Sequence, residues 1–313
     1  MSSSRNITTA VPLPSCVRNA IDGLALGLLN PPGSAPMDFT RPIGEPSLTA
    51  HDSMSWEIFK NPVAMFVGGV AAVILELAEP RVRTGVWEHS TFRAQPMLRL
   101  QRTGLAAMVT VYGARSVAER MIAGVVRRHG QVTGFTPAGE RYEANDVDLL
   151  TWVQATAGFG FAQAFHAYVR PLRQDELDRF YLEGAPAARL YGALHAPTSE
   201  AGMRALFDRT GGRLESSPIV FEFLDILGEA PILPAPLRPV QRLLIRAAVE
   251  ITPGWVRERL GLTSAQGLGA MEARFVRWAG ALADRIVLAR SPAVQACRRL
   301  GLPADYLYRR SAR

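Results

Sequence analysis

Apolar residues recur at every third or fourth position through most of the chain after residue 55, which is the spacing of an amphipathic helix. Proline at positions 96, 236, 253 and 292 suits the first turn of a helix. The pattern predicts helices at residues 55–59, 62–77, 96–112, 115–129, 145–168, 174–191, 199–210, 218–227, 236–250, 253–260, 264–289 and 292–300. Strand patterns are confined to a short hairpin at 134–144, so we expect an all-α, single compact multi-helix domain.

The first fifty residues have a different composition from the rest of the chain. They are rich in proline, glycine, serine and threonine, with one short helical pattern around residues 17–29. We therefore expect residues 1–50 to form a largely irregular N-terminal arm that wraps the body. Residues 51–313 would then form the helical domain.

The most apolar stretch runs from Pro62 to Ala78 and is interrupted by Glu76. Its length lies at the lower edge of what a membrane-spanning helix needs. Because so much other apolar surface has to pack on a centre, we interpret it as a buried core helix. Association with a membrane surface, which only this segment and the arginine content suggest, is the less favoured alternative. The N-terminus does not show the pattern of a secretory signal, which favours a cytoplasmic location.

Charge and cysteine content narrow the classes of function. The net charge of +7 comes from arginines scattered along the chain, with Lys60 as the only lysine. Scattered arginines without interleaved aromatic residues argue against nucleic-acid binding. Cys16 and Cys297 lie at opposite ends of the chain, so a structural zinc site is not expected. Phosphate-loop, dinucleotide-binding, HExxH and GxSxG motifs are also absent from the sequence.

His129 ends the helix predicted at 115–129 and is followed by Gly130. It shares a helix face with Ile122, Val125 and Val126, so the imidazole is expected to point inward. An inward imidazole needs a partner. One interpretation is a core histidine bonded to a carbonyl group, and the other is a metal ligand. One histidine does not hold a naked ion, but it can hold haem iron, for which the porphyrin supplies four other ligands.

Arg99, Arg102 and Thr103 lie at positions i, i+3 and i+4 of the helix predicted at 96–112, and hence on one face. The residues that follow are apolar almost all round, so the helix is expected to be buried. Buried guanidinium groups are costly unless they meet anions. They either form salt bridges with acids such as Glu76 or Glu79, or line a pocket for an anionic group or a bound oxidant.

The helix predicted at 145–168 is thin over its middle turns. Its small residues include Gly158 and Gly160, and Thr156 shares a face with Trp152 and Phe159. A thin helix allows another helix or a planar ligand to approach closely. Tight helix packing and ligand binding explain this pattern equally well.

These elements together resemble a known family. The segment "NPVAMFVGGVAAVILELAEPRVRTGVWEHSTFRAQPMLRLQRT" is similar to the opening block of the family of latex-clearing protein (rubber oxygenase) and the MpaB-type oxygenases. "RRHGQVTG" and "RYEANDVDLLTWVQAT" resemble its next two blocks, and residues 233–262 its closing block. Each element is weak by itself, but the order and spacing of all of them are specific.

The resemblance implies an all-α fold with a globin-like core around a b-type haem. It places His129 as the axial iron ligand and makes Arg99 and Thr156 further cofactor-binding residues. It also implies a distal cluster on the opposite side, formed by Arg99 together with Arg102 and Thr103. Arg102 stands where latex-clearing protein has a lysine.

Two positions depart from the family pattern. Gln154 replaces the histidine common in the "WVHAT" motif, a change that alters proton delivery or marks an inactive branch. Thr133 stands where latex-clearing protein has an arginine, so a contact to the porphyrin or the distal side is expected to be missing.

The leading hypothesis is therefore a haem-dependent oxygenase that uses dioxygen on an apolar substrate of isoprenoid, fatty or aromatic type. Arg102 would act electrostatically, because a guanidinium does not release its proton near neutral pH, and protons would pass through Thr103 and water. The alternative is a non-catalytic helical protein of the same fold, which has lost haem and binds an apolar ligand or a partner. Gln154 favours that alternative.

Overall fold

The computed structural model describes residues 6–27, 29–31, 33 and 35–311. Within these residues it contains fourteen α-helices and confirms the all-α prediction. The helices are α1 (Ser15–Gly27), α2 (Met54–Phe59), α3 (Pro62–Ala78), α4 (Pro80–His89), α5 (Pro96–Tyr112), α6 (Arg115–His129), α7 (Val147–Tyr168), α8 (Gln174–Tyr191), α9 (Glu200–Gly211), α10 (Pro218–Glu229), α11 (Arg238–Ile251), α12 (Gly254–Leu260), α13 (Ala270–Ala283) and α14 (Pro292–Arg299).

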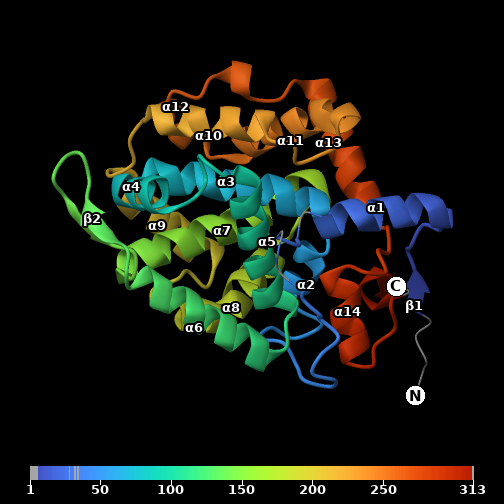
Figure 1. Cartoon of the computed structure of the whole chain (residues 1–313). Coiled ribbons are helices and arrows are strands. Elements are labelled where there is room, and N and C mark those ends of the chain that lie inside the picture. Colours follow the sequence, from blue (N-terminus) through green and yellow to red (C-terminus); the bar gives the residue numbers. More distant parts are fainter. Residues whose placement is uncertain (1–5, 28, 32, 34, 312–313) are drawn as a thin grey trace.

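The centre of the fold is the pair α3 and α7 (Figure 1). Helix α3 begins at Pro62, whose missing N–H costs nothing in the first turn, and the Asn61 side chain accepts from the N–H groups of Val63 and Ala64. Two glycines bring the helices together: a Cβ on Gly68 would lie 2.8 Å from the Gly160 carbonyl oxygen. The prediction that residues 62–78 form a buried core helix is confirmed.

Other helices cover this pair on two sides. Helices α10 and α11 pack against α3 on one side, and α8 packs against α7 on the other, with α6 outside it (Figure 1). Helix α5 packs against α2, α6 and α14. Helices α5 and α6, which carry all the predicted functional residues except Thr156 of α7, therefore pack against each other.

A small hairpin follows α6, as the sequence predicts. Strands β2 (Thr133–Phe135) and β3 (Arg141–Glu143) pair antiparallel, with Gly134 opposite Tyr142. Gly139 adopts a φ of +82° in the turn, a conformation that favours glycine. After the hairpin, the Asn145 side-chain N–H group donates to the Val126 carbonyl oxygen over 3.1 Å, which ties the end of the hairpin to the last turn of α6.

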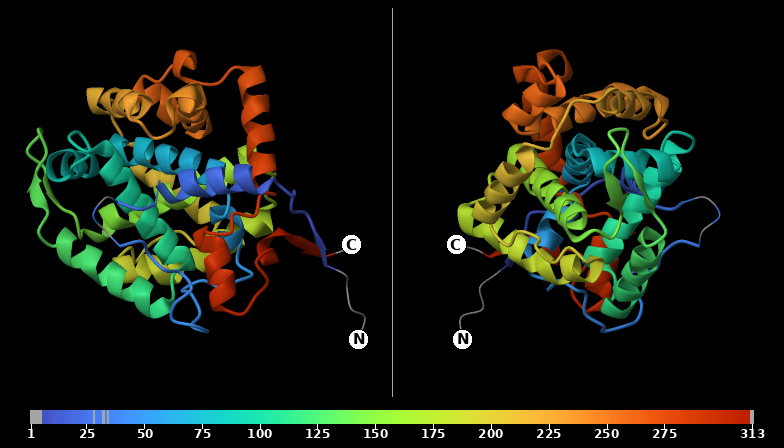
Figure 2. Two further views of the ribbon diagram at one scale, coloured as in Figure 1. Left: turned by 45° about the vertical axis from the view of Figure 1, so that its right-hand side comes forward. Right: turned by 90° about the vertical axis from the view of Figure 1, so that its left-hand side faces the viewer.

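Contacts along its length join the N-terminal segment to the body. Strand β1 (Asn6–Thr8) pairs antiparallel with β4 (Arg309–Ser311), so that these two strands from opposite parts of the sequence lie side by side (Figure 2). The Gln101 side chain of α5 donates to the Gly27 carbonyl oxygen at the end of α1. Arg299 of α14 is buried and donates to the carbonyl oxygens of Phe39 and Glu45.

Three sequence predictions were wrong in detail. Helix α4 begins at Pro80, directly after α3, where no helix was predicted. The single helix expected at 264–289 is instead a 3₁₀ turn at Ser264–Gln266 followed by α13, because the chain is extended at Gly267 and Gly269. The β1–β4 pair is a second sheet beyond the one hairpin expected.

Within the described residues, no single helix is long and apolar enough to cross a membrane. Helices α3 and α4 taken together are long and apolar enough, but the chain bends by 110° between them.

Candidate functional site

His129 is the last residue of α6, and its side chain is half-buried. Ile122, two turns earlier on the same face, is fully buried. The Nδ1 atom of His129 is buried and has no hydrogen-bond partner among the described residues. The Nδ1 edge of the ring therefore points inward, as expected. Because this atom accepts or donates no hydrogen bond among the described residues, the interpretation as a core histidine bonded to a carbonyl is not supported at Nδ1.

The surroundings of His129 keep its imidazole neutral. Burial lowers the pKa of His129, and the positive charges of Arg99 and Arg128 lower it further. A neutral imidazole keeps the nitrogen lone pair that a metal ligand needs. The influence of Arg99 also shows that α5 and α6 present these two side chains to the same region.

The Arg99 and Thr103 side chains are joined by hydrogen bonds on α5. Arg99 donates through Nη1 to Thr103 Oγ1 over 2.9 Å, and that hydroxyl donates to the Arg99 carbonyl oxygen over 2.9 Å. Arg102 and Thr103 are exposed, and only Arg99 is half-buried. The prediction that this face is buried was thus wrong for Arg102 and Thr103, because the apolar residues that suggested it lie further along the helix.

Glu76 of α3 belongs to the same cluster. Burial raises the pKa of the Glu76 carboxyl to about 7, although the nearby Arg99 charge lowers it. Burial also lowers the pKa of Arg99, while Glu76 opposes this effect. In the part of the chain that the structure describes, Arg99 forms no direct ion pair, so Glu76 and Arg99 influence each other from beyond ion-pair distance.

The sequence offered Glu76 and Glu79 equally as partners for the arginines of α5. Glu79 instead lies 2.9 Å from Arg81 and 3.4 Å from Arg213, and it caps α4 by accepting from the Val82 N–H group. Glu76 is therefore the acid that faces Arg99. It was missed as a functional residue, and the signal that could have found it is its position as the lone charge in the apolar run.

One stripe of α3 keeps solvent-accessible surface although the helix lies at the centre of the fold. Phe66, Gly69, Val73 and Glu76 are half-buried, whereas most other residues of α3 are buried. Their spacing of three and four residues places them on one face. We call this face the accessible stripe. It is apolar except for Glu76 at its end.

Thr156 has a different environment from the α5 and α6 residues. It is fully buried in α7, and its hydroxyl donates to the Val153 carbonyl oxygen of its own helix over 2.9 Å. It lies one turn from Trp152, which donates to the Leu75 carbonyl oxygen of α3, and one turn from Gly160. Thr156 is thus part of the close packing of α7 on α3. Gln154 is half-buried on another side of α7.

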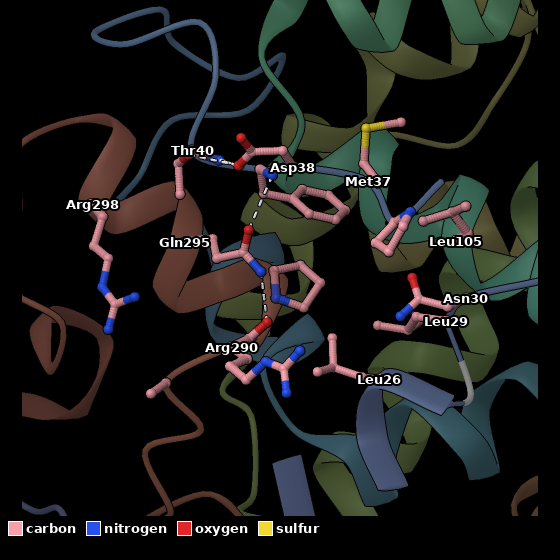
Figure 3. A pocket seen from close by; sticks show the side chains of 14 residues that line it. Leu26, Leu29, Asn30, Met37, Asp38, Thr40, Leu105, Arg290, Gln295 and Arg298 are labelled. Atoms are coloured by element: carbon pink, nitrogen blue, oxygen red, sulfur yellow. Dashed lines mark hydrogen bonds between the residues drawn. The ribbon is translucent and has the colours of Figure 1, made fainter. Parts of the chain in front are cut away.

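Two pockets lie elsewhere in the molecule. The first, of about 330 Å³, opens between the end of α1, the segment that follows it and α14 (Figure 3). Leu29, Met37 and Leu105 line one side, and Gln295 and Arg298 line the other. The second, of about 420 Å³, lies among α7, α11 and α13 and is lined by residues that include Tyr168, Glu250 and Arg277. Neither pocket contains Glu76, Arg99 or His129.

The described residues hold no group of three or more histidine, cysteine, aspartate or glutamate side chains that could bind a metal ion. The structure instead brings together one histidine with a lowered pKa, one half-buried carboxyl and one half-buried guanidinium from three helices. It leaves Arg102 at the surface end of this cluster and Thr156 in the helix packing.

Comparison with known proteins agrees with the sequence motifs. Residues 56–284 match the family model described as the catalytic domain of ER-bound oxygenase mpaB/B' and rubber oxygenase. No curated protein and no solved structure showed significant similarity to the chain. The matched segment contains Glu76, Arg99, Arg102, Thr103, His129 and Thr156, and it covers most of the chain. The chain therefore belongs to the mpaB and rubber oxygenase catalytic-domain family.

Proposed function

We propose that this oxygenase-family protein is a haem-dependent enzyme that uses dioxygen on an apolar small molecule, with His129 as the axial iron ligand. The observation that carries the proposal is the His129 imidazole, whose pKa is lowered by burial and whose buried Nδ1 has no hydrogen-bond partner among the described residues. Family membership supports oxygenase chemistry in general.

The donor set fits a b-type haem better than a bare ion. A porphyrin supplies four iron ligands, so that a single histidine is enough to complete the attachment on one side. A bare ion needs several side chains, and the described residues provide no such group. When bound, haem would supply the activation of dioxygen that side chains alone do not provide.

The neighbouring side chains have separate roles in this proposal. Arg99 keeps its charge at neutral pH and would orient an anionic group of the cofactor, while Thr103 holds the guanidinium in place. Arg102, at the exposed end, would act on developing negative charge without giving up a proton. Thr156 would act indirectly, as part of the packing that holds α7 against α3.

Glu76 is the group in this cluster that can exchange a proton near neutral pH. Its pKa of about 7 leaves both protonation states populated under working conditions. We infer that the Glu76 carboxyl holds and returns the proton that the sequence alone assigned to Thr103 and water. Arg99 moderates this pKa, so the two residues would work as a pair.

The substrate class follows from the accessible stripe. Phe66, Gly69 and Val73 provide apolar surface that continues to Glu76. Apolar walls with a few convergent polar groups suit an isoprenoid, fatty or aromatic molecule. Both oxidative cleavage of a carbon–carbon double bond and insertion of oxygen are compatible with this environment.

The absorption spectrum of the protein produced with sufficient haem tests the proposal. We expect a Soret band and about one b-type haem per chain. His129→Ala should abolish the band or leave weakly held haem, whereas the control His89→Ala should keep it, because His89 contacts the Tyr142 hydroxyl instead.

An unchanged spectrum in His129→Ala would reject the axial assignment. A wild-type protein that folds but takes up no haem would reject the haem proposal. That result would favour the alternative in which a non-catalytic protein of this fold binds an apolar ligand, as Gln154 suggests.

A further inference from the structure

Helix α13 carries an apolar face that points away from the protein. Met271, Phe275 and Trp278 lie at positions i, i+4 and i+7, and their exposed fractions are 73%, 44% and 61%. The Phe275 and Trp278 rings lie against each other with centroids 5.8 Å apart. Single exposed apolar residues are ordinary on a protein surface, but three large ones on one helix face form a patch that needs an explanation.

The opposite face of α13 is firmly attached to the body. Val276 is fully buried, and the Asn61 side chain donates to the Gly280 carbonyl oxygen over 2.9 Å. A Cβ on Gly280 would overlap the Tyr168 carbonyl oxygen, so the helix packs closely on the end of α7. The helix stands upright at the edge of the molecule (Figure 2). Its apolar face therefore cannot turn into the core.

Positive charge borders this apolar face. Arg274 and Arg277 are exposed along one side of it, and neither forms an ion pair within the described part of the chain. The acids of this region are engaged on the protein side: Glu272 lies 2.6 Å from Arg246, and Asp284 lies 2.6 Å from Lys60. Among the described residues, the charge on this helix that has no ion-pair partner is thus positive, in a chain whose net charge is +7.

We propose that Met271, Arg274, Phe275, Arg277 and Trp278, the α13 surface, bind to the surface of a membrane that contains anionic lipids. Aromatic and methionine side chains enter the boundary between headgroups and acyl chains, and neighbouring arginines bind the negative headgroups. Helix α13 has 14 residues and lies on the protein, so it would rest in the interface without crossing the membrane.

A comparison within the molecule favours lipid as the occupant of this particular face. Helix α8 also exposes large apolar residues, with Leu182 at 60% and Leu190 at 41%. On α8, however, the exposed leucines are interleaved with charges of both signs, namely Asp178, Glu183, Arg179 and Arg189. An anionic membrane would therefore gain less from that mixed face than from the α13 surface, where three large apolar side chains are bordered by arginines that form no ion pair among the described residues.

Flotation of the full chain with lipid vesicles tests the proposal. We expect binding to vesicles of phosphatidylcholine with phosphatidylserine, and much weaker binding to phosphatidylcholine alone or at high salt. The variant M271S/F275S/W278S should lose roughly tenfold in partition coefficient for each side chain replaced. Arg274→Gln with Arg277→Gln should lose roughly fivefold for each arginine.

The matched control is L182S/L190S on α8, which removes exposed apolar groups from a different helix. It should float like the wild type, and both sets of variants should keep the wild-type circular dichroism spectrum. Equal losses in the α8 and α13 variants, or no vesicle binding by the wild type, would overturn the proposal. So would a concentration-dependent dimer that the α13 variant abolishes in analytical ultracentrifugation, because the face would then bind a second copy.

Trp278 gives a second measurement that does not depend on activity. Its indole should move from water to the lipid boundary, so the vesicles should shift tryptophan emission to shorter wavelength. Trp278→Phe should remove most of this shift while it keeps most of the flotation. A shift that persists in Trp278→Phe would place the contact elsewhere on the molecule and contradict the proposal.

Discussion

Glu76 shows how one half-buried carboxyl ties the stability of this protein to pH. The folded protein raises the Glu76 pKa from 4.5 to about 7, mainly through burial. From about pH 4.5 to about pH 7 the unfolded chain loses this proton while the folded chain keeps it. Folding therefore becomes less favourable as pH rises through this window, and the deficit is constant above it.

We predict that Glu76→Gln is more stable than the wild type above pH 7. The difference between the two pKa values corresponds to about 3 kcal/mol of unfolding free energy. Urea unfolding at about pH 8 should show most of this gain, and the gain should largely vanish near pH 4.5. Glu119→Gln, at an exposed position on α6, serves as the control and should show no such dependence. The same gain at both pH values would contradict the assigned pKa.

At the residue scale, the sequence predicted orientation better than burial. Helical spacing alone indicated that His129 points inward and that Arg99 and Thr103 share a face. It could not show that Arg102 is exposed, because exposure depends on which helices cover α5. It also could not choose between Glu76 and Glu79, since the choice depends on the 110° bend between α3 and α4.

At the scale of elements, the contact between α3 and α7 depends on two small residues. A Cβ on Gly160 would overlap the Gly68 carbonyl oxygen and lie 3.1 Å from the Ala72 nitrogen. Both obstacles are main-chain atoms in the middle of helices, so neither can move aside easily. The two central helices can approach each other this closely only because Gly68 and Gly160 have no side chains.

We predict that Gly160→Ala destabilises the protein by about 1–3 kcal/mol or more, because the added methyl group forces the central helices apart. Gly69→Ala on α3 is the matched control, since its Cβ would meet only a Phe161 ring atom at 4.0 Å. That variant should be neutral or slightly stabilising, by up to about 1 kcal/mol. Thermal unfolding compares the two, and an equal effect of both would argue against the close contact.

Long helices with regular spacing were predictable, and short or distant elements were not. Helix α6 has the predicted bounds of 115–129 because its apolar spacing and following glycine agree. Helix α4 was missed because it has only ten residues and four of them are charged or histidine, so its apolar positions show no clear helical spacing. The three-residue strands β1 and β4 pair across almost the whole chain, and no local pattern encodes such a pairing.

For the molecule as a whole, Arg299 joins three distant segments. Its guanidinium donates to the carbonyl oxygens of Phe39, Glu45 and Tyr112 and to the Ser47 hydroxyl, while only 1% of the residue is exposed. It thereby links the segment before α2, the end of α5 and α14. Five guanidinium donors in one plane allow a single side chain to reach all of them.

We predict that Arg299→Met lowers the unfolding free energy by at least about 3 kcal/mol, because several buried carbonyl groups would lose their donors. The neighbouring Arg298 is exposed, so Arg298→Met should change stability by no more than about 0.5 kcal/mol. Chemical denaturation of both variants measures the difference. A mild effect of Arg299→Met would show that water or other donors replace the guanidinium.

The choice of acceptors at Arg299 has a consequence for mutational tolerance. Three of its four partners are main-chain carbonyl groups, which every amino acid supplies. Substitutions at Glu45 can therefore leave this junction intact, because its main-chain oxygen remains. Position 299, in contrast, requires an arginine to donate all of these hydrogen bonds. The junction therefore restricts the amino acid at position 299. The sequences of the segments that it joins can vary as far as their own packing permits.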